Sequence, residues 1–203
     1  MAERQSTLRA RRRAETQRLI QAHAVRLFTE RGYDTTTVND VAVAAGVSAM
    51  TVYRHFPTKE DLVLADQHGR LVGERLAATS PAEPLVRRIC GALVDATAAL
   101  TDGDPATRQH LLARLRLMIS TPALRARHLD NHYALQEAIV DALGAADPEA
   151  AFRIRAAAGA CLAAMHTALA RWAEEDGKTS LPALIAQAQA AAFGDHAVEG
   201  GAT

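Results

Sequence analysis

Seven residues between positions 49 and 59 have side chains that suit contact with a phosphate backbone. They are small groups, hydroxyls and cations, namely Ala49, Met50, Thr51, Tyr53, Arg54, His55 and Lys59. Cations and hydroxyls bind phosphate oxygens, and the set contains no carboxylate that would repel them. A short helix that ends before Pro57 would bring most of these side chains to one surface.

The residues just before this segment predict another short helix and a glycine turn. One face of that helix is apolar, with residues at i, i+3, i+4 and i+7: Val38, Val41, Ala42 and Ala45. Thr37 and Asp40 predict a capping box at its start, because a hydroxyl and a carboxylate at this spacing bind free backbone amides. Gly46 predicts a left-handed turn, which glycine adopts without a Cβ clash.

A second short helix is predicted from Ala49 to Phe56, with Ser48 as its N-cap. Val52 and Phe56 point back towards the first helix, so the polar side chains lie on the exposed side. Two short helices joined by a tight glycine turn form a helix-turn-helix, whose second helix enters the major groove of DNA. The pattern therefore predicts a DNA-binding unit.

An amphipathic helix from about residue 15 to residue 31 is expected to cover the back of this pair. Its apolar stripe consists of Ile20, Ala24, Leu27 and Phe28, and Gly32 ends it. Before it lies a basic segment with Arg4, Arg9, Arg11, Arg12 and Arg13. Such an arm can reach neighbouring phosphates or a minor groove. A solvated, frayed terminus is the alternative.

The rest of the chain predicts an all-α fold. A second capping box, Thr58 with Asp61, starts a helix that is expected to link two domains over about residues 58–78. We expect an N-terminal DNA-binding domain at residues 1–60 and a C-terminal regulatory and dimerisation domain at residues 61–203. The Pro-containing segment 79–84 is the clearest break in the sequence. Further helices are predicted at about 85–100, 106–120, 123–143, 149–175 and 181–193, before a disordered tail at about 194–203.

Composition and charge agree with this division. Of the 203 residues, 49% are hydrophobic, which indicates a globular chain. Residues 1–60 carry ten Lys/Arg against six Asp/Glu, whereas residues 61–203 carry thirteen against seventeen. The asymmetry favours a DNA-facing N-terminal part, with sampling noise as the alternative. The longest apolar tract, residues 156–170, is too short and too weakly hydrophobic to span a bilayer, and no secretory signal is recognisable, so we expect a soluble protein with no membrane partner.

Other groups of reactive side chains give weaker signals. Cys90 and Cys161 lack CxxC spacing and are expected to be reduced, buried small hydrophobes. His128 and His132 have the i, i+4 spacing of a two-histidine metal face, but no third ligand is evident in the sequence. We therefore expect surface or pocket-lining histidines and no metal. No phosphate-binding loop, nucleophile elbow or paired carboxylate is recognisable, so neither an enzyme nor a cofactor is expected.

An apolar cavity between C-terminal helices is the candidate site for a small molecule. Residues that could line it are Leu111, Arg114, Leu115, Met118, Ile119, Phe152, Leu162, Met165, His166 and Leu169. Arginines in this half could hold a phosphate or carboxylate, and together they favour an anionic amphiphile. Ordinary core packing and solvated surface charges are the alternatives.

The run FTERGYDTTTVNDVAVAAGVSAMTVYRHFPTKEDLV strongly resembles the TetR family of bacterial transcriptional regulators. The resemblance covers about residues 15–65, and it implies a homodimer that binds a palindromic operator on double-stranded DNA, most often as a repressor. Such a regulator would be cytoplasmic and nucleoid-associated. By matching positions, the resemblance implies DNA contacts by Thr36 and Thr37, base-facing positions at Ala49, Met50 and Thr51, phosphate contacts by Tyr53, His55 and Lys59, and either kind of contact by Arg54.

The stretch LARLRLMISTPALRARHLDNHYALQEAIVDALG resembles a TetR branch that includes the mycofactocin-system regulator, which implies an acyl-CoA-like effector. The family resemblance also implies a dimer interface in the last two long helices. Their many alanines could equally form intramolecular core, and Trp172 could be an interface anchor or a pocket wall. Two other functions stay open: a constitutive DNA-binding regulator or adaptor without ligand, and a small helical enzyme acting on a thioester or ester.

Overall fold

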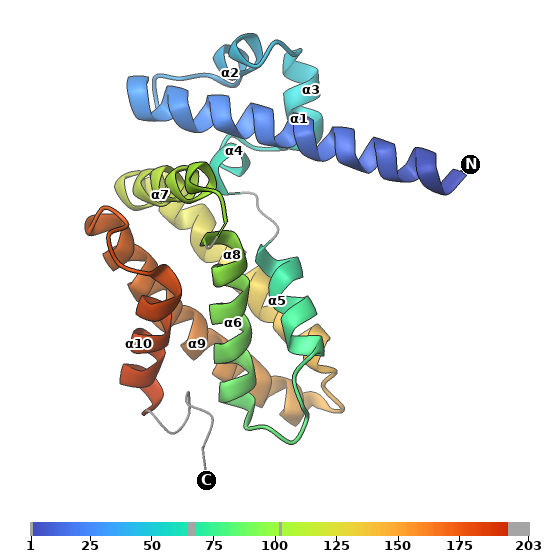
Figure 1. The fold of residues 1–203 in the computed structure, drawn as a ribbon, viewed down its shortest axis with the longest axis vertical. Coiled ribbons are helices and arrows are strands. Elements are labelled where there is room, and N and C mark those ends of the chain that lie inside the picture. Colours follow the sequence, from blue (N-terminus) through green and yellow to red (C-terminus); the bar gives the residue numbers. More distant parts are fainter. Residues whose placement is uncertain (1, 65–67, 102, 195–203) are drawn as a thin grey trace. The chain divides into compact units, whose positions relative to one another are not determined.

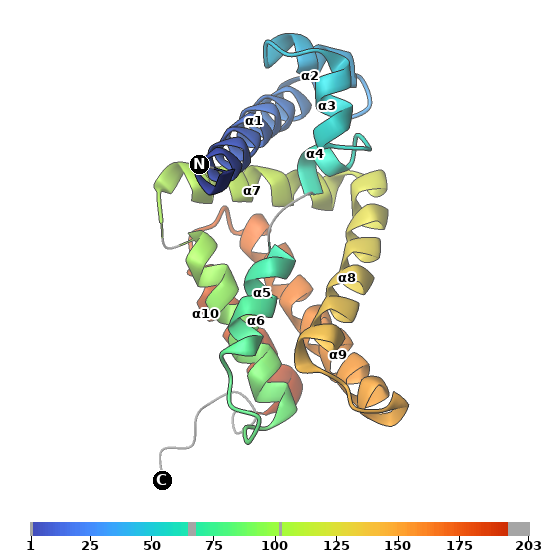
Figure 2. The ribbon, with the colours of Figure 1, turned by 90° about the vertical axis from the view of Figure 1, so that its right-hand side faces the viewer.

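The computed structural model describes residues 2–64, 68–101 and 103–194, and every element in these ranges is a helix. The predicted all-α fold is thereby confirmed. The chain divides into two compact units (Figures 1 and 2). Unit 1 comprises Met1–Ala65 with Leu117–Arg125, and unit 2 comprises Asp66–Arg116 with Ala126–Thr203. None of the described helices has the length and apolar character needed to cross a membrane.

Unit 1 is built around its first helix, α1 (Ala2–Arg31), which packs against α2 and α4. Its buried residues are the predicted stripe of Ile20, Ala24, Leu27 and Phe28. The predicted start near residue 15 was wrong, because the basic segment before it continues the same helix. Alanine and arginine are both strong helix formers, and no Gly or Pro interrupts residues 2–31. The helix ends as predicted at Gly32, which has φ +91°.

Three short helices follow α1 in unit 1. They are α2 (Val38–Ala44), α3 (Ala49–His55) and α4 (Asp61–Leu64), and α2 packs against both α1 and α3 (Figure 1). The predicted second capping box is present, since the backbone amide of Thr58 donates to Asp61 Oδ2 (3.1 Å) and the amide of Asp61 donates to Thr58 Oγ1 (3.2 Å). The single linking helix predicted over residues 58–78 crosses residues 65–67, which lie outside the described residues.

Unit 2 is centred on α6 (Leu85–Thr101), which packs against α5 (His68–Ala77), α9 (Pro148–Glu174) and α10 (Leu181–Phe193). Helices α9 and α10 also pack side by side. The remaining helices, α7 (Pro105–Ser120) and α8 (Pro122–Leu143), each contribute residues to both units. The core of unit 2 includes fully buried side chains from these helices: Leu76, Ile89, Leu93, Ile139, Leu162, Trp172 and Ile185.

The five helices predicted after residue 84 begin and end within one or two residues of their predicted bounds. Local signals explain this agreement. Asp147 caps α9 by accepting a hydrogen bond from the amide of Ala150 (2.8 Å), and Pro148 follows at the first helical position. The predicted disordered tail falls almost wholly on residues 195–203, which lie outside the described residues.

Candidate functional site

The turn between α2 and α3 has the hydrogen bonds that its sequence predicts. At the start of α2, the amide of Thr37 donates to Asp40 Oδ2 (2.8 Å) and the amide of Asp40 donates to Thr37 Oγ1 (3.2 Å), which completes the capping box. At the end of α2, Gly46 has φ +65° and the amide of Val47 donates to the carbonyl of Ala42 (3.0 Å). This is the glycine-dependent C-cap that reverses the chain towards α3.

Helix α3 is stabilised by a capping hydrogen bond at its first turn and by the burial of one of its faces. Ser48 Oγ accepts a hydrogen bond from the amide of Thr51 (3.1 Å), so the predicted N-cap is present. Val52 is 0% exposed and Phe56 is 2% exposed, and both belong to the core of unit 1. Because this face is buried, the opposite face of α3 is left to solvent.

The exposed face of α3 carries Met50, Tyr53 and Arg54. Met50 is 77% exposed and Tyr53 is 49% exposed. Ala49 and Thr51 are half-buried beside them. The helix contains no acidic residue. The exposed surface therefore presents a cation, a phenol and apolar groups to solvent, with no carboxylate on the helix.

His55 lies at the last turn of α3 and is half-buried. Burial lowers its pKa, and the positive charges of Arg13 and Arg54 lower the pKa further. Its Nδ1 is buried without a hydrogen-bond partner among the described residues. A neutral ring with Nε2 protonated fits this surrounding, because Nδ1 then needs no acceptor. In this neutral form the ring keeps one N–H donor, at Nε2.

The Lys59 side chain contacts Tyr33 within unit 1. Its Nζ donates to the backbone carbonyl of Tyr33 (2.6 Å) and lies 4.2 Å from the centroid of the Tyr33 ring. The Tyr33 hydroxyl in turn donates to Glu60 Oε1 (2.8 Å). An ammonium group has three donors, so Lys59 keeps donors for a phosphate, but it also fixes the segment that follows α1.

The two threonines before α2 have different surroundings. Thr37 is exposed, as expected for a residue that contacts DNA. Thr36 is only 1% exposed, and its hydroxyl donates to the carbonyl of Gly32 (2.9 Å). The structure therefore places the Thr36 side chain in the core, where it satisfies a carbonyl at the end of α1 and is not available to a phosphate.

Arg11, Arg12 and Arg13 are exposed and lie on consecutive positions of α1. Arg11 is 4.0 Å from Glu15, a surface pair of little energetic value. Consecutive residues of a helix point in different directions. Of the three, only Arg13 is close enough to His55 for its positive charge to lower the pKa of that ring, so Arg13 lies on the same side of unit 1 as the end of α3.

The ten predicted ligand-pocket residues fall on two helices and both units. Leu111, Arg114 and Leu115 belong to the unit 2 part of α7, Met118 and Ile119 to its unit 1 part, and Phe152, Leu162, Met165, His166 and Leu169 to α9. Those that are buried below one-tenth exposure are Leu115, Met118, Leu162 and Met165. Phe152 is 63% exposed, so in the single chain it does not line an apolar cavity. Trp172 is 0% exposed, and its Nε1 donates to the carbonyl of Thr179 (2.8 Å), which makes it a core residue and not an exposed anchor.

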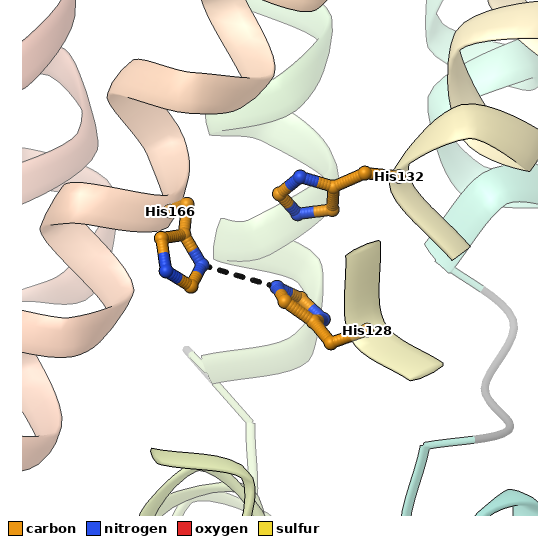
Figure 3. A group of neighbouring side chains, drawn as sticks. All are labelled: His128, His132 and His166. Atoms are coloured by element: carbon orange, nitrogen blue, oxygen red, sulfur yellow. Dashed lines mark hydrogen bonds between the residues drawn. The ribbon is translucent and has the colours of Figure 1, made fainter. Parts of the chain in front are cut away.

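A group of three histidines is the feature that sequence reasoning missed. His128 and His132 share a face of α8, and His166 of α9 lies beside them (Figure 3). His128 Nε2 and His166 Nδ1 are 3.2 Å apart. His166 was predicted only as a pocket residue, because 34 positions separate it from His132 and no local spacing connects them.

The fold and the exposed face of α3 define a helix-turn-helix transcriptional regulator. Residues 20–65 match the family profile described as bacterial regulatory proteins of the tetR family, and residues 87–192 match the MftR C-terminal domain. The chain belongs to the TetR family and has a C-terminal domain of the MftR type, so the family resemblance is confirmed.

Individual relatives match parts of the chain. An uncharacterised helix-turn-helix regulator of Mycobacterium tuberculosis is 52% identical over 44 residues, which is 22% of each chain. The regulator TcmR of Streptomyces glaucescens is 30% identical over 128 residues, covering 60% of this chain and 56% of TcmR. The matched segments thus span well under two thirds of these relatives. Among solved structures, Thermus thermophilus FadR in complex with lauroyl-CoA covers 92% of this chain and 98% of its own, with a TM-score of 0.52 and 21% identity, a likeness that shows the fold.

Proposed function

We propose that the protein is a transcriptional repressor that binds a palindromic operator as a homodimer and is released by an anionic amphiphile such as a fatty acyl-CoA. The observation that carries the proposal is the exposed face of α3, where Met50, Tyr53 and Arg54 face solvent on a helix without any carboxylate. Membership of the TetR family supports the same reading.

Phosphate contacts would supply most of the affinity for DNA. Ala49 and Met50 cannot make bidentate hydrogen bonds to base edges, so base readout is left to methyl contacts, Thr51, Arg54 and DNA shape. Tyr53, His55 and Lys59 would donate hydrogen bonds to phosphate, and the exposed arginines of α1 would add positive charge. Binding should therefore depend strongly on salt.

The dimer would form through α9 and α10. Both helices expose small side chains in the single chain: Ala156, Ala160 and Ala163 on α9, and Ala183 and Ala191 on α10. Small residues let helices of two subunits approach closely in a four-helix bundle. A two-fold dimer would present two copies of α3 to half-sites about one helical turn apart or a multiple of that distance.

The effector class rests on the MftR-type domain and on chemistry in unit 2. Thermus thermophilus FadR, which shares the fold, binds lauroyl-CoA. In this chain, α9 carries apolar Leu162, Met165 and Leu169, and α7 carries half-buried Arg114. An acyl chain with a phosphate-bearing head matches that combination of apolar and cationic groups. If effector binding favoured a spacing of the two α3 helices that does not match the half-sites, the operator would be released.

The test is fluorescence anisotropy of the full-length protein on a labelled duplex from its own upstream region, at about 50 and 200 mM salt. We expect binding that weakens steeply with salt and is lost on addition of lauroyl-CoA. Tyr53→Ala with Arg54→Ala should weaken binding at least about tenfold and reduce the salt slope by about 1. Arg26→Ala is the matched control, because Arg26 is an exposed α1 residue that pairs with Glu30.

The outcomes separate the parts of the proposal. If the α3 double variant binds as tightly as the wild type, with the same salt slope, the DNA surface is misassigned. If lauroyl-CoA at about 100 μM neither binds nor releases the duplex, far above the nanomolar-to-micromolar range of specific ligands, the effector class fails and a constitutive regulator is the better description. Hydrolysis of the thioester by the protein would instead favour an enzyme.

A further inference from the structure

The geometry points to a transition-metal site formed by His128, His132 and His166, which binds one divalent ion of the Zn²⁺ class. Each histidine offers one ring nitrogen, and these three atoms lie within 4.8 Å of one another (Figure 3). The ring centroids of His128 and His132 are 4.3 Å apart, and that of His166 lies 5.2 and 5.7 Å from them. Three imidazoles thus converge on one point from two helices.

The distances fit tetrahedral coordination. Zinc binds imidazole nitrogen at about 2.0–2.1 Å, so two ligands of one tetrahedral ion are about 3.3 Å apart. His128 Nε2 and His166 Nδ1 already stand at 3.2 Å, which is such an edge. The His132 nitrogen lies within 4.8 Å of both, so each of these two distances would have to shorten by about 1.5 Å at most to complete the face. The side chains of all three histidines are half-buried, so none of them is sealed within the core.

The donor set selects the kind of ion. Three neutral imidazoles suit Zn²⁺, Co²⁺, Ni²⁺ and Cu²⁺, whereas Mg²⁺ and Ca²⁺ prefer oxygen ligands. Between His128 and His166, one nitrogen now carries a proton that the other accepts. On metal binding, that proton moves to the other nitrogen of its ring, so both lone pairs face the ion. Three protein ligands leave a fourth position for water or for an oxygen of a bound molecule.

The two helices that carry the ligands are joined by a polar clasp further along their length. Arg155 of α9 pairs with both carboxylate oxygens of Glu137 on α8 (2.6 and 2.8 Å), and Gln136 Nε2 donates to the carbonyl of Arg155 (2.5 Å). Gly159 makes room for this contact, since a Cβ there would lie 2.9 Å from Gln136 Nε2. The clasp links α8 and α9 by three hydrogen bonds near the histidines, although its ion pair is exposed and contributes little energy by itself.

Simple polar packing of three imidazoles is the competing explanation, and a metal titration distinguishes the two. Full-length protein without a histidine tag is treated with EDTA, dialysed and titrated with Co²⁺, whose visible absorption reports tetrahedral nitrogen coordination. We expect one Co²⁺ per chain, displaced by an equivalent of Zn²⁺. His128→Ala, His132→Ala and His166→Ala should each weaken binding by at least about 100-fold.

Two controls protect the interpretation. His23→Ala removes a histidine on α1 that lies outside the cluster, and it should leave Co²⁺ affinity unchanged. His166→Gln keeps a polar side chain at the site, and circular dichroism of this variant should match the wild type while Co²⁺ affinity falls. The proposal is overturned if the wild type binds Co²⁺ no more tightly than the triple alanine variant, or if His166→Gln binds as the wild type does.

Discussion

The sulfur atoms of Cys90 and Cys161 lie 3.5 Å apart, one on α6 and one on α9, although 71 residues separate them along the chain. Both are free thiols, and both are buried as predicted, with exposed fractions of 1% and 0%. The two thiols share a hydrogen bond, which lowers the pKa of Cys90 and, together with burial, raises the pKa of Cys161. Cys90 is therefore the sulfur more readily deprotonated for attack in this pair.

We predict that the folded protein forms an intramolecular disulfide between Cys90 and Cys161 when it is treated with diamide. The diamide takes up two electrons and two protons, and the sulfur atoms close from 3.5 Å to about 2.05 Å. Mass spectrometry under denaturing conditions should show the loss of two hydrogen atoms per chain without any disulfide-linked pair of chains. A closed loop of this length would stabilise the fold by up to about 4 kcal/mol, less any strain.

The matched control for the disulfide is Cys161→Ser, which leaves a single thiol and should show neither the mass loss nor the gain in thermal stability. Burial should make the reaction slow in the native protein. If the wild type keeps two reactive thiols after long exposure to diamide and later unfolding, the two sulfur atoms do not meet in solution.

The second prediction concerns His55 at the end of α3. Its pKa is held below the ordinary value by burial first and then by the positive charges of Arg13 and Arg54. In NMR titration of the protein without DNA, the His55 ring should titrate below a free histidine, and Arg13→Ala should raise its pKa. Arg18→Ala changes another arginine of α1 and is the control. It should leave the pKa of His55 unchanged, because the charge of Arg18 is not among the causes of the shift. A titration insensitive to Arg13 would show that α1 and α3 do not share this basic surface.

The third prediction is a pH dependence set by the capping box of α2. Hydrogen bonds from the Thr37 side chain, followed by one from its backbone, lower the pKa of Asp40. A carboxylate whose pKa is lower in the folded state stabilises the fold above the unfolded pKa, about 3.9, and this contribution is lost as pH falls through the folded pKa. Asp40→Ala should therefore be less stable than the wild type at neutral pH, and the gap should close in acid.

Denaturant unfolding at a series of pH values measures that gap. Thr37→Val tests whether the Thr37 hydroxyl lowers the pKa of Asp40, because it removes that donor. In this background the stability difference caused by Asp40→Ala should disappear at a higher pH. A difference between wild type and Asp40→Ala that stays constant from neutral to acid pH would mean that the carboxylate is not held in its ionised form by Thr37.

Much of the fold could be predicted because its signals are local. The caps at Thr37, Ser48 and Thr58 and the turn at Gly46 lie within four residues of the helices that they control, and all are present as predicted. The start of α1 was missed because helix propensity decides it, whereas the prediction followed apolar periodicity, which the basic segment lacks.

Features that depend on contacts between distant segments could not be predicted. The third histidine and the cysteine pair join different helices, and no spacing rule connects His166 with His128 or Cys90 with Cys161. The burial of Thr36 has a different cause. Its hydroxyl satisfies the carbonyl of Gly32, so the core accepts a residue type that is mostly exposed.

The last prediction compares two glycines with left-handed backbones, Gly46 at φ +65° and Gly177 at φ +67°. No other atom lies within 4 Å of a Cβ built on Gly46, so Gly46→Ala should cost only the backbone term, about 1–2 kcal/mol. At Gly177 the new Cβ would lie 3.1 Å from Cζ2 of Trp172, a ring that is 0% exposed and anchored by its own hydrogen bond. Gly177→Ala should therefore cost more, because a buried indole cannot move aside easily.

Trp172 is the single tryptophan of the chain, so its fluorescence reports this contact directly. Gly177→Ala should shift the emission of the native protein and lower its denaturant midpoint, whereas Gly46→Ala should leave the native emission unchanged. Gly91→Ala is the control for the exchange itself. Gly91 is exposed within α6 with nothing within 4 Å of a built Cβ, so alanine there should stabilise by about 0.5–1 kcal/mol. Equal destabilisation by Gly46→Ala and Gly177→Ala would show that the indole yields, and that the loop after α9 is held by the backbone alone.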